Sequence, residues 1–160
     1  MTQDARFEDA GVPALRLRAE DTEDLKIIST LVQDAIFPIS EISWKPRERR
    51  FALLLNRFRW EDQSKARQRQ RAFERVQSVL AFDDVSKVSS QGVDRTDVDV
   101  ILSLLSIGWE AGSDGTGRLV LTLAGDGAIA LDTECVNVTL QDVTQPYIAP
   151  SRRAPQHPED

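Results

Sequence analysis

The spacing of apolar residues changes near residue 39. Between Leu25 and Ile36 the apolar side chains recur at three- and four-residue intervals, which is typical of a helix with one buried face. Asp21 stands before this run as a candidate N-cap, and Pro38 follows it. We therefore predict one amphipathic helix that begins after Asp21 and ends at Pro38. No later segment has a convincing helical period.

The rest of the chain has the pattern of β-strands. Apolar residues recur there with a period close to two. Turn residues at 113–115 and 125–127 favour tight hairpins, and strands joined so closely are antiparallel because parallel strands need a long crossover. We expect an α+β fold with a mainly antiparallel meander of six to seven strands. They cover residues 15–19, 39–44, 50–60, 71–88, 99–111, 117–125 and 128–143.

Residues 98–107 are apolar at most positions rather than at every second one. A strand of this composition is normally covered on both faces, here by the helix or by a second subunit. A curled or split-barrel-like sheet, with a pleckstrin-homology-like arrangement as one candidate, also buries its middle strands and removes exposed edges. We expect the sheet to curl, with the helix over its open side.

The two ends lack the periodicity of the middle. Residues 1–12 and 145–160 are mostly polar, and the second segment is rich in proline. We therefore predict a disordered N-terminal tail at 1–12, a single domain at 13–144 and a flexible C-terminal tail at 145–160. The first residues are neither basic nor apolar, no apolar run reaches bilayer length, and Cys135 is the only cysteine. These features predict a cytoplasmic protein that does not enter a membrane.

Basic residues are concentrated in one segment of an acidic chain. The net charge is −6, yet eleven of the 20 lysines and arginines lie between Lys45 and Arg75, where only four acidic residues occur. The overall charge argues against a generic binder of nucleic acid or membrane surfaces. The local excess predicts either a basic patch or a region that complements an acidic part of the same fold.

Residues 50–60, RFALLLNRFRW, combine this basic character with a break in the apolar alternation. In a regular strand Phe51, Leu53 and Leu55 share one face, whereas Phe58 and Trp60 share the opposite face. A β-bulge between the two sets would return both to the same core. We therefore predict a bulge at Asn56–Arg57, with Arg57 and Arg59 directed outward.

Two interpretations of these arginines remain open, and we favour the first. In the first, they pair on the outer face with nearby glutamates, and each pair contributes little to stability. Those glutamates are Glu41, Glu48, Glu61 and Glu74. In the second, guanidinium groups converge near an indole ring and form a surface for an anion or a partner. That candidate binding surface comprises Arg49, Arg57, Arg59, Trp60 and Trp44.

Common catalytic and metal-binding motifs are absent from the chain. It contains no HExxH, GxSxG or CxxC motif, no glycine-rich phosphate loop, and one histidine, His157, in the proline-rich tail. Catalysis by a histidine-activated nucleophile and histidine-based metal binding are therefore disfavoured. We expect no catalytic residue, no cofactor and no metal. We assign Cys135 to the core because no histidine can activate it.

Three segments resemble a known protein family. They are AEDTEDLKIISTLVQDAIF, RERRFALLLNRFRWE, and LAGDGAIALDTEC followed by LQD. The chain is similar, over about residues 15–143, to a family of small single-domain bacterial proteins, best known in alphaproteobacteria, whose domain has no known function. The resemblance implies a small cytoplasmic protein in which the NRFRWE string belongs to the family pattern. It implies no activity, substrate or catalytic residue.

The missing catalytic groups and the apolar strand at 98–107 favour a non-enzymatic binding or assembly module. Such a module acts through its β-sheet, with a protein partner or a second copy of itself. The alternative is a binder of RNA or of a phosphorylated ligand that uses the arginines and aromatic residues of 44–60. Nucleic acid is the less favoured partner because the chain is acidic. An enzyme that relies on carboxylates and arginines alone ranks third.

Overall fold

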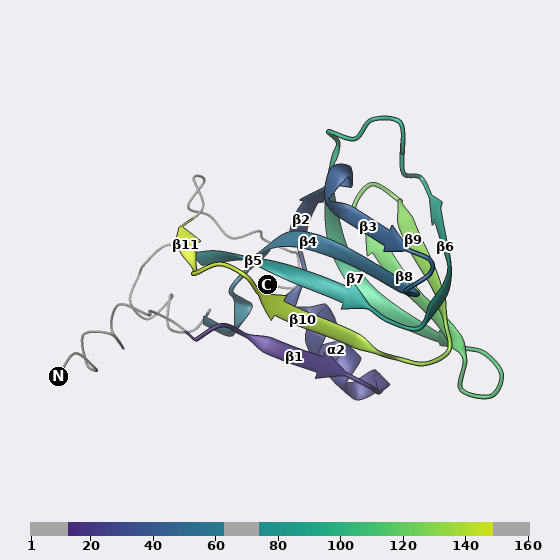
Figure 1. Ribbon diagram of the computed structural model, residues 1–160. Helices are drawn as coiled ribbons and strands as arrows, with labels where there is room; N and C mark the ends of the chain where they lie inside the picture. Colours follow the sequence, from purple (N-terminus) through teal and green to yellow (C-terminus); the bar gives the residue numbers. More distant parts are fainter. Residues whose placement is uncertain (1–12, 63–73, 149–160) are drawn as a thin grey trace.

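The computed structural model describes residues 13–62 and 74–148 (Figure 1). The predicted tail at 1–12 and residues 149–160 of the second tail lie outside the described residues, as does 63–73. The helices are α2 (Thr22–Leu31), η1 (Ile39–Glu41) and η2 (Trp60–Asp62). The strands are β1 (Arg16–Ala19), β2 (Ala35–Pro38), β3 (Ile42–Lys45), β4 (Arg50–Phe58), β5 (Glu74–Phe82), β6 (Val85–Gln91), β7 (Ile101–Ala111), β8 (Gly117–Leu123), β9 (Ala128–Thr133), β10 (Val138–Asp142) and β11 (Tyr147–Ile148).

The described strands form a single antiparallel sheet. Its order is β1-β10-β5-β4-β2-β7-β8-β9-β6, with β3 attached to β4 and β11 attached to β5. This arrangement confirms a mainly antiparallel α+β fold with one α-helix. The sheet curls strongly but remains open, with β1 and β6 at its two ends (Figure 1). The predicted number of six to seven strands is too low, because the sheet has eleven.

Two of the predicted strands each turn a corner and therefore form four. The sequence predicts single strands at 71–88 and 128–143, and the described residues 74–88 of the first run beside the second. β5 pairs with β10 on one side of the corner, and β6 pairs with β9 on the other side. At the corner Asp84 has a φ of 62°, and the Asp83 N–H donates to the Asn137 carbonyl at 3.0 Å. Such bends let strands pass from one part of a curled sheet to another.

Helix α2 begins as predicted but ends several residues early. The Asp21 carboxylate accepts a hydrogen bond from the Asp24 N–H at 2.8 Å, which confirms the predicted N-cap. The chain leaves the helix after Leu31, and Asp34 adopts a φ of 64°. Its N–H donates to the Leu104 carbonyl at 2.7 Å, so the next residues pair with β7 as β2. The longer helix that we predicted is wrong because sheet pairing overrides the local period.

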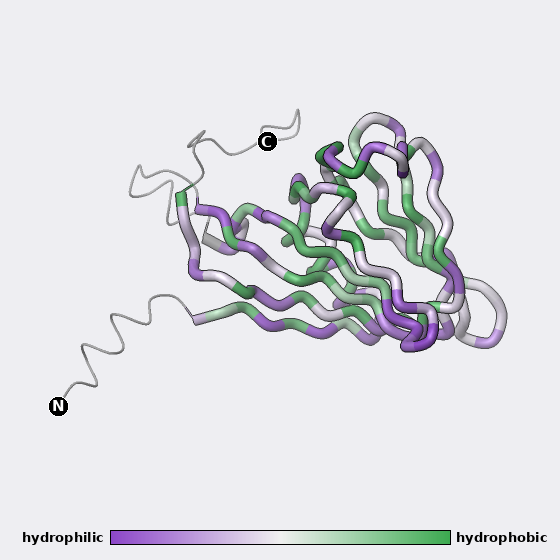
Figure 2. The backbone as a smooth tube through the Cα atoms, turned by 45° about the horizontal axis from the view of Figure 1, so that its top comes forward, coloured by the Kyte–Doolittle hydropathy of each residue, from purple (hydrophilic) through white to green (hydrophobic). Residues whose placement is uncertain are grey.

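The inner side of the sheet and the apolar face of α2 form the core. In Figure 2 the hydrophobic positions concentrate along the strands and the hydrophilic positions at the turns. Helix α2 packs against β7 and β1, and the Ile107 N–H donates to Ser29 Oγ at 2.9 Å. The helix residues buried in the core are Leu25 and Ile28, together with the C-cap residue Val32.

The predicted bulge at Asn56–Arg57 is wrong. β4 pairs with β5 in an unbroken register through its last residue. Phe58 is nevertheless buried, because the second face of the strand is also covered at this end, and Trp60 is half-buried just beyond the strand. Phe58 lies on that face, with its ring 5.5 Å from the Trp60 ring and 4.0 Å from the Arg75 guanidinium carbon. The strand therefore needs no extra residue to bury its aromatic end.

A bulge is present in β7 instead. Its register against β8 shifts between Leu104 and Ser106, which brings both Leu104 and Ile107 into the core. Ile101, at the start of the same strand, is 58% exposed. The expectation that residues 98–107 are covered on both faces is therefore wrong. The run of apolar residues arises because the bulge changes which alternate residues of the strand point into the core.

Candidate functional site

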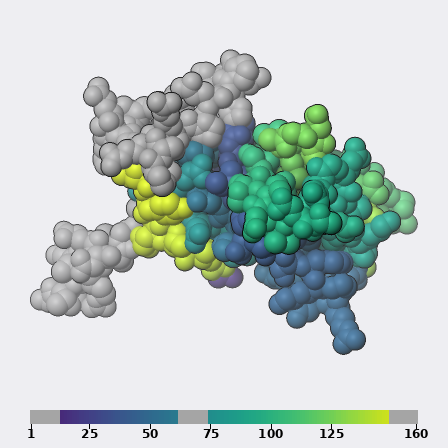
Figure 3. All heavy atoms as spheres, turned by 90° about the horizontal axis from the view of Figure 1, so that it is seen from above, coloured from purple at the N-terminus to yellow at the C-terminus, as the bar shows by residue number. Residues whose placement is uncertain are grey.

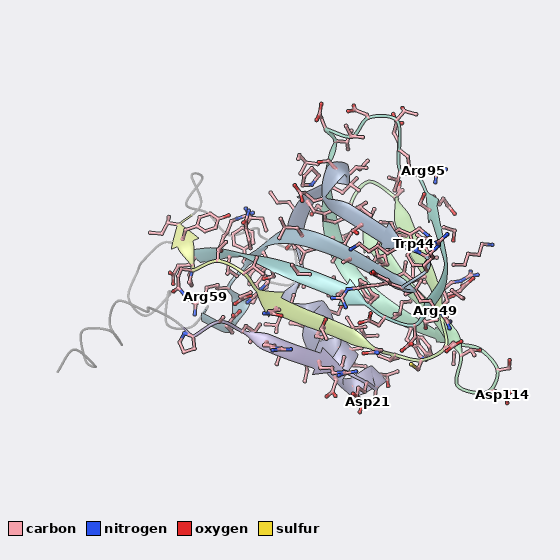
Figure 4. All side chains as sticks on the ribbon, in the orientation of Figure 1. Asp21, Trp44, Arg49, Arg59, Arg95 and Asp114 are labelled. Atoms are coloured by element: carbon pink, nitrogen blue, oxygen red, sulfur yellow. The ribbon has the colours of Figure 1, made fainter. Side chains whose placement is uncertain are left out.

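The five residues of the predicted binding surface are distributed over both ends of β4. Arg57 lies in β4, Arg59 and Trp60 follow it, Arg49 precedes it, and Trp44 belongs to β3. β4 has nine residues, which corresponds to roughly 30 Å. Figure 4 shows Arg49 and Trp44 toward one side of the molecule and Arg59 toward the other. The structure brings Arg57, Arg59 and Trp60 into one region but does not gather all five.

Arg57 points into the protein, so the expectation that it faces solvent is wrong. Its side chain is 0% exposed. Nη1 and Nη2 donate to the two carboxylate oxygens of Glu61, each at 2.9 Å. Nη2 also donates to Asp142 Oδ1 at 3.0 Å, and Nε donates to Ser78 Oγ at 3.1 Å. The guanidinium has no exposed surface, and its N–H groups are directed at acceptors inside the fold.

The partners of Arg57 tie distant segments together. Ser78 Oγ donates to Asp142 Oδ1 at 2.7 Å, and the Leu15 N–H donates to Asp142 Oδ2 at 3.1 Å. The cluster thus joins β4, β5, β10 and the residue before β1. Burial alone would lower the pKa of Arg57, but Glu61 and Asp142 raise it above its usual value. Burial would raise the pKa of Glu61, but the hydrogen bonds and charge of Arg57 lower it.

Arg59 and Trp60 also make contacts within the fold. Arg59 Nη1 lies 2.7 Å from Glu74 Oε1, and both side chains are mostly buried. The Trp60 indole N–H donates to the Gln33 carbonyl at 2.9 Å. Glu61 and Glu74 were both among the predicted glutamate partners. The charge-pair interpretation therefore describes this end of β4 better than an anion surface does, although the pairs are more buried than expected.

At the other end of β4, Arg49 and Trp44 belong to the wall of the curled sheet. Arg49 has a φ of 58°, and its Nη2 lies 2.8 Å from Glu134 Oε1. Trp44 is half-buried and packs against the core. A polar cleft of about 550 Å³ lies beside Arg49. Its second arginine, Arg118, pairs with Asp132 at 2.8 Å, so both cations of this cleft already have carboxylate partners.

Cys135 lies at the sheet corner and is exposed, so its assignment to the core is wrong. Its thiol donates to Asp84 Oδ2 at 3.5 Å, and Asn137 Nδ2 donates to the same oxygen at 3.1 Å. Partial burial and then the Asp84 carboxylate raise the pKa of the thiol. The hydrogen bond from Asn137, followed by that from Cys135, lowers the pKa of Asp84. This arrangement keeps the thiol protonated and argues against a nucleophilic role.

The strongest candidate binding site is a seam between two edges of the sheet, β3 and β6. Among the described strands, β3 pairs only with β4 and β6 pairs only with β9. An apolar pocket of about 260 Å³ lies between them. Phe51 and Ile129, both buried, belong to its lining. The other lining residues are Ile39, Ile42, Val88, Ser89, Ser90, Val93 and Arg95.

Hydrogen bonds hold both ends of this seam. At the end near the sheet corner, the Val85 N–H donates to the Arg49 carbonyl at 3.0 Å. At the other end, the Ile39 and Ser40 N–H groups donate to the carbonyls of Val100 and Val98, at 3.2 and 3.3 Å. In Figure 3 the residues of the 92–100 loop lie beside those of η1 and β3. The pocket is therefore a preformed opening in the wall of the sheet.

Metal-ligand clusters and membrane-spanning helices are absent from residues 13–62 and 74–148. Within these ranges no group of three or more histidine, cysteine, aspartate and glutamate residues could hold a metal ion. None of the helices there is long and apolar enough to cross a membrane.

The fold and the seam define a class of small protein in which one open, curled antiparallel sheet and one α-helix enclose a core with a buried arginine. The chain belongs to the family described as "Protein of unknown function (DUF2948)", whose model matches residues 15–157. This match confirms the family resemblance and extends it past residue 143. No curated protein and no solved structure matches the chain. The bacterial origin of the chain stays a prediction.

Sequence reasoning missed the residues of the seam. It merged β5 and β6 into one strand, so it did not place Val88 on a sheet edge, and it did not consider Val93 or Arg95. A signal was present in the sequence, because Gly92 directly follows VSKVSSQ, the residues that form β6. A glycine at the end of an alternating run commonly marks a turn, and this turn carries Val93 and Arg95 to the pocket.

Proposed function

We propose that this protein is a non-enzymatic cytoplasmic module that binds an extended segment of a partner protein in the seam between β3 and β6. The apolar pocket between these two sheet edges is the observation that carries the proposal. An extended segment that adds to a sheet edge gains main-chain hydrogen bonds, and a pocket beside the edge selects its side chains.

The shape of the seam supports this function. Phe51 and Ile129 line the pocket as rigid core residues, whereas Val88 and Val93 are only half-buried. Because both ends of the seam are held by backbone hydrogen bonds, little ordering is needed when a segment binds, and preorganisation of this kind favours affinity. Apolar side chains with a few polar groups at the rim are typical of binding pockets.

The alternative of an RNA or phosphorylated-ligand binder has less support. Arg57 is buried with two carboxylates, and Arg49 and Arg59 each pair with a glutamate. An anion would have to compete with these carboxylates for the guanidinium groups. Self-association through a sheet edge is the other form of the proposed function, and light scattering across a concentration series would reveal it.

Selection from a phage-displayed library of random heptapeptides against the full-length protein tests the proposal. Selected peptides should bind the wild type. Their affinity for Val88→Gln should be at least about tenfold lower, because the pocket wall loses apolar contact. Val79→Gln is the matched control, since Val79 is also half-buried but lies on β5, away from the seam. Its affinity should equal that of the wild type. Failure to select any peptide, or equal binding to Val88→Gln, would contradict the proposal.

A further inference from the structure

We infer that the segment bound in the seam is acidic, with an apolar side chain in the pocket and a carboxylate two residues away against Arg95. This inference rests on the proposed function, because it assigns the chemistry of the partner at the same seam. Residues i and i+2 of an extended segment point to the same face. One face of the segment can therefore present both groups to the protein.

Arg95 is an available cation at the rim of the pocket. It is exposed and lines the pocket, and among the described residues it has no ion pair or hydrogen bond. A guanidinium group in this position can grip a carboxylate with two parallel hydrogen bonds. Arg95 therefore differs from Arg49, Arg57 and Arg59, whose carboxylate partners belong to the same chain.

The loop that carries Arg95 is held in place. Gly92 has a φ of 68°, and a Cβ there would lie 3.1 Å from the Asp126 carbonyl oxygen, so only glycine fits this turn easily. Asp94 Oδ1 accepts hydrogen bonds from the Thr96 N–H at 3.0 Å and from its hydroxyl at 2.5 Å. Arg95 is therefore presented from an ordered turn that costs little entropy to use in binding.

The aspartates of the loop do not neutralise Arg95 directly. Asp94 is occupied by Thr96, and Asp97 Oδ1 accepts a hydrogen bond from the Asp99 N–H at 3.2 Å. These carboxylates face their own loop backbone. Their negative charge weakens the attraction for an anion over longer distances, so Arg95 would act mainly through direct contact.

The two strands that border the seam favour an acidic partner as well. β3 has the sequence ISWK and β6 has VSKVSSQ, so the charged residues within both edges are lysines. Lys87 is exposed, and Lys45 Nζ lies 3.9 Å from the Glu48 carboxylate in the adjoining turn. Lysines on sheet edges discourage pairing between like copies. Neither strand places an acidic residue opposite such a segment, and Arg95 is the cation that lines the pocket.

The test compares heptapeptide selections against the wild type, Arg95→Glu, and the control Arg16→Glu, which changes an exposed arginine on β1 at the far end of the sheet. The wild type and Arg16→Glu should enrich peptides with Asp or Glu two residues from an apolar residue. Arg95→Glu should enrich Lys or Arg at that position. Changing the acidic residue of a selected peptide to its amide should weaken binding to the wild type about three- to tenfold.

Two pocket variants separate this inference from the proposed function. Val88→Gln and Val93→Gln change residues that line the same pocket and leave its charge unchanged. Circular dichroism identifies any variant that fails to fold. Some selected peptides could depend on Val88 or Val93 and yet show the same charge preference with Arg95→Glu. That result would overturn the inference of an acidic partner but would leave the seam as a binding site. Absence of any peptide sensitive to these valines would overturn both.

Discussion

Arg57 and Asp142 are 85 residues apart in the sequence, yet Nη2 of the arginine lies 3.0 Å from Oδ1 of the aspartate inside the fold. The pair connects the C-terminal end of β4 with the last residue of β10. Asp142 also accepts the Leu15 N–H, so the contact fixes the point at which the chain joins the sheet. A buried charge of this kind is tolerated only while its partners stay in place.

Arg57→Met should lower the free energy of unfolding by about 3–5 kcal/mol, because it leaves Asp142 buried without its cation. Urea denaturation followed by circular dichroism measures the change. Arg50→Met is the matched control on the same strand. Arg50 is exposed and its guanidinium lies 3.3 Å from Asp83, so its loss should cost less than about 1 kcal/mol. Equal losses in the two variants would contradict a special role for the buried arginine.

Local signals predicted the parts of the fold that depend on near neighbours. Asp21 caps the helix as expected, and the turns at 113–115 and 125–127 contain positive-φ residues at Asp114, Gly115, Gly125 and Asp126. These features depend on only a few adjacent residues, so they can be predicted from the local sequence.

The parts that sequence reasoning missed depend on distant partners. Beyond the end of α2, the Asp34 N–H donates to the Leu104 carbonyl and directs the chain into the sheet, and no residue near Asp34 indicates that contact. Arg57 lies two residues after Leu55 and continues the same inward face, but a charged residue on a core face is expected only when its partners are known. The seam likewise follows from the order of strands in the sheet, which periodicity does not define.

Glu61→Gln should destabilise the protein at pH 7 by about 1–2 kcal/mol, since it removes a charged acceptor from Arg57. Because the pKa of Glu61 is lowered in the folded protein, its contribution is complete above the unfolded pKa of about 4.3 and is lost as the pH falls through the folded pKa. The difference in stability between wild type and variant should therefore narrow as the pH falls below about 4.3. The exposed residue Glu48 gives the control Glu48→Gln, which should change stability little at pH 7 or at pH 3.

A difference that persists undiminished at pH 3 would contradict this account of Glu61. It would mean that the side chain stabilises the fold through packing rather than through its charge. Urea denaturation curves at both pH values distinguish the two causes, because packing does not depend on the protonation of the carboxylate.

Gly117→Ala should destabilise the protein by about 1–3 kcal/mol. A Cβ at this position would lie 2.5 Å from the Trp109 Cη2 atom and 2.6 Å from the Glu110 carbonyl oxygen, so the indole or the strand has to move. Gly108→Ala is the control, because a Cβ there would meet nothing within 4 Å. That change should be neutral or raise stability by up to about 1 kcal/mol. Thermal and urea unfolding of both variants measure the contrast.

Asp84→Asn should make the Cys135 thiol more reactive. The Asp84 carboxylate accepts a hydrogen bond from the thiol and raises its pKa, so removal of the negative charge should lower that pKa and increase the thiolate fraction at pH 8. Asparagine tolerates the φ of 62° at this corner, and its side-chain oxygen can still accept from Asn137. The backbone corner should therefore stay intact while the charge is lost.

The rate of alkylation by iodoacetamide reports this change cleanly, because Cys135 is the only cysteine in the chain. We expect faster alkylation of Asp84→Asn than of the wild type, with the difference shrinking at a pH high enough to ionise both thiols. Glu134→Gln is a milder control, since Glu134 contributes less than Asp84 to the raised pKa of the thiol. An unchanged rate in Asp84→Asn would show that partial burial, rather than the carboxylate, controls the thiol.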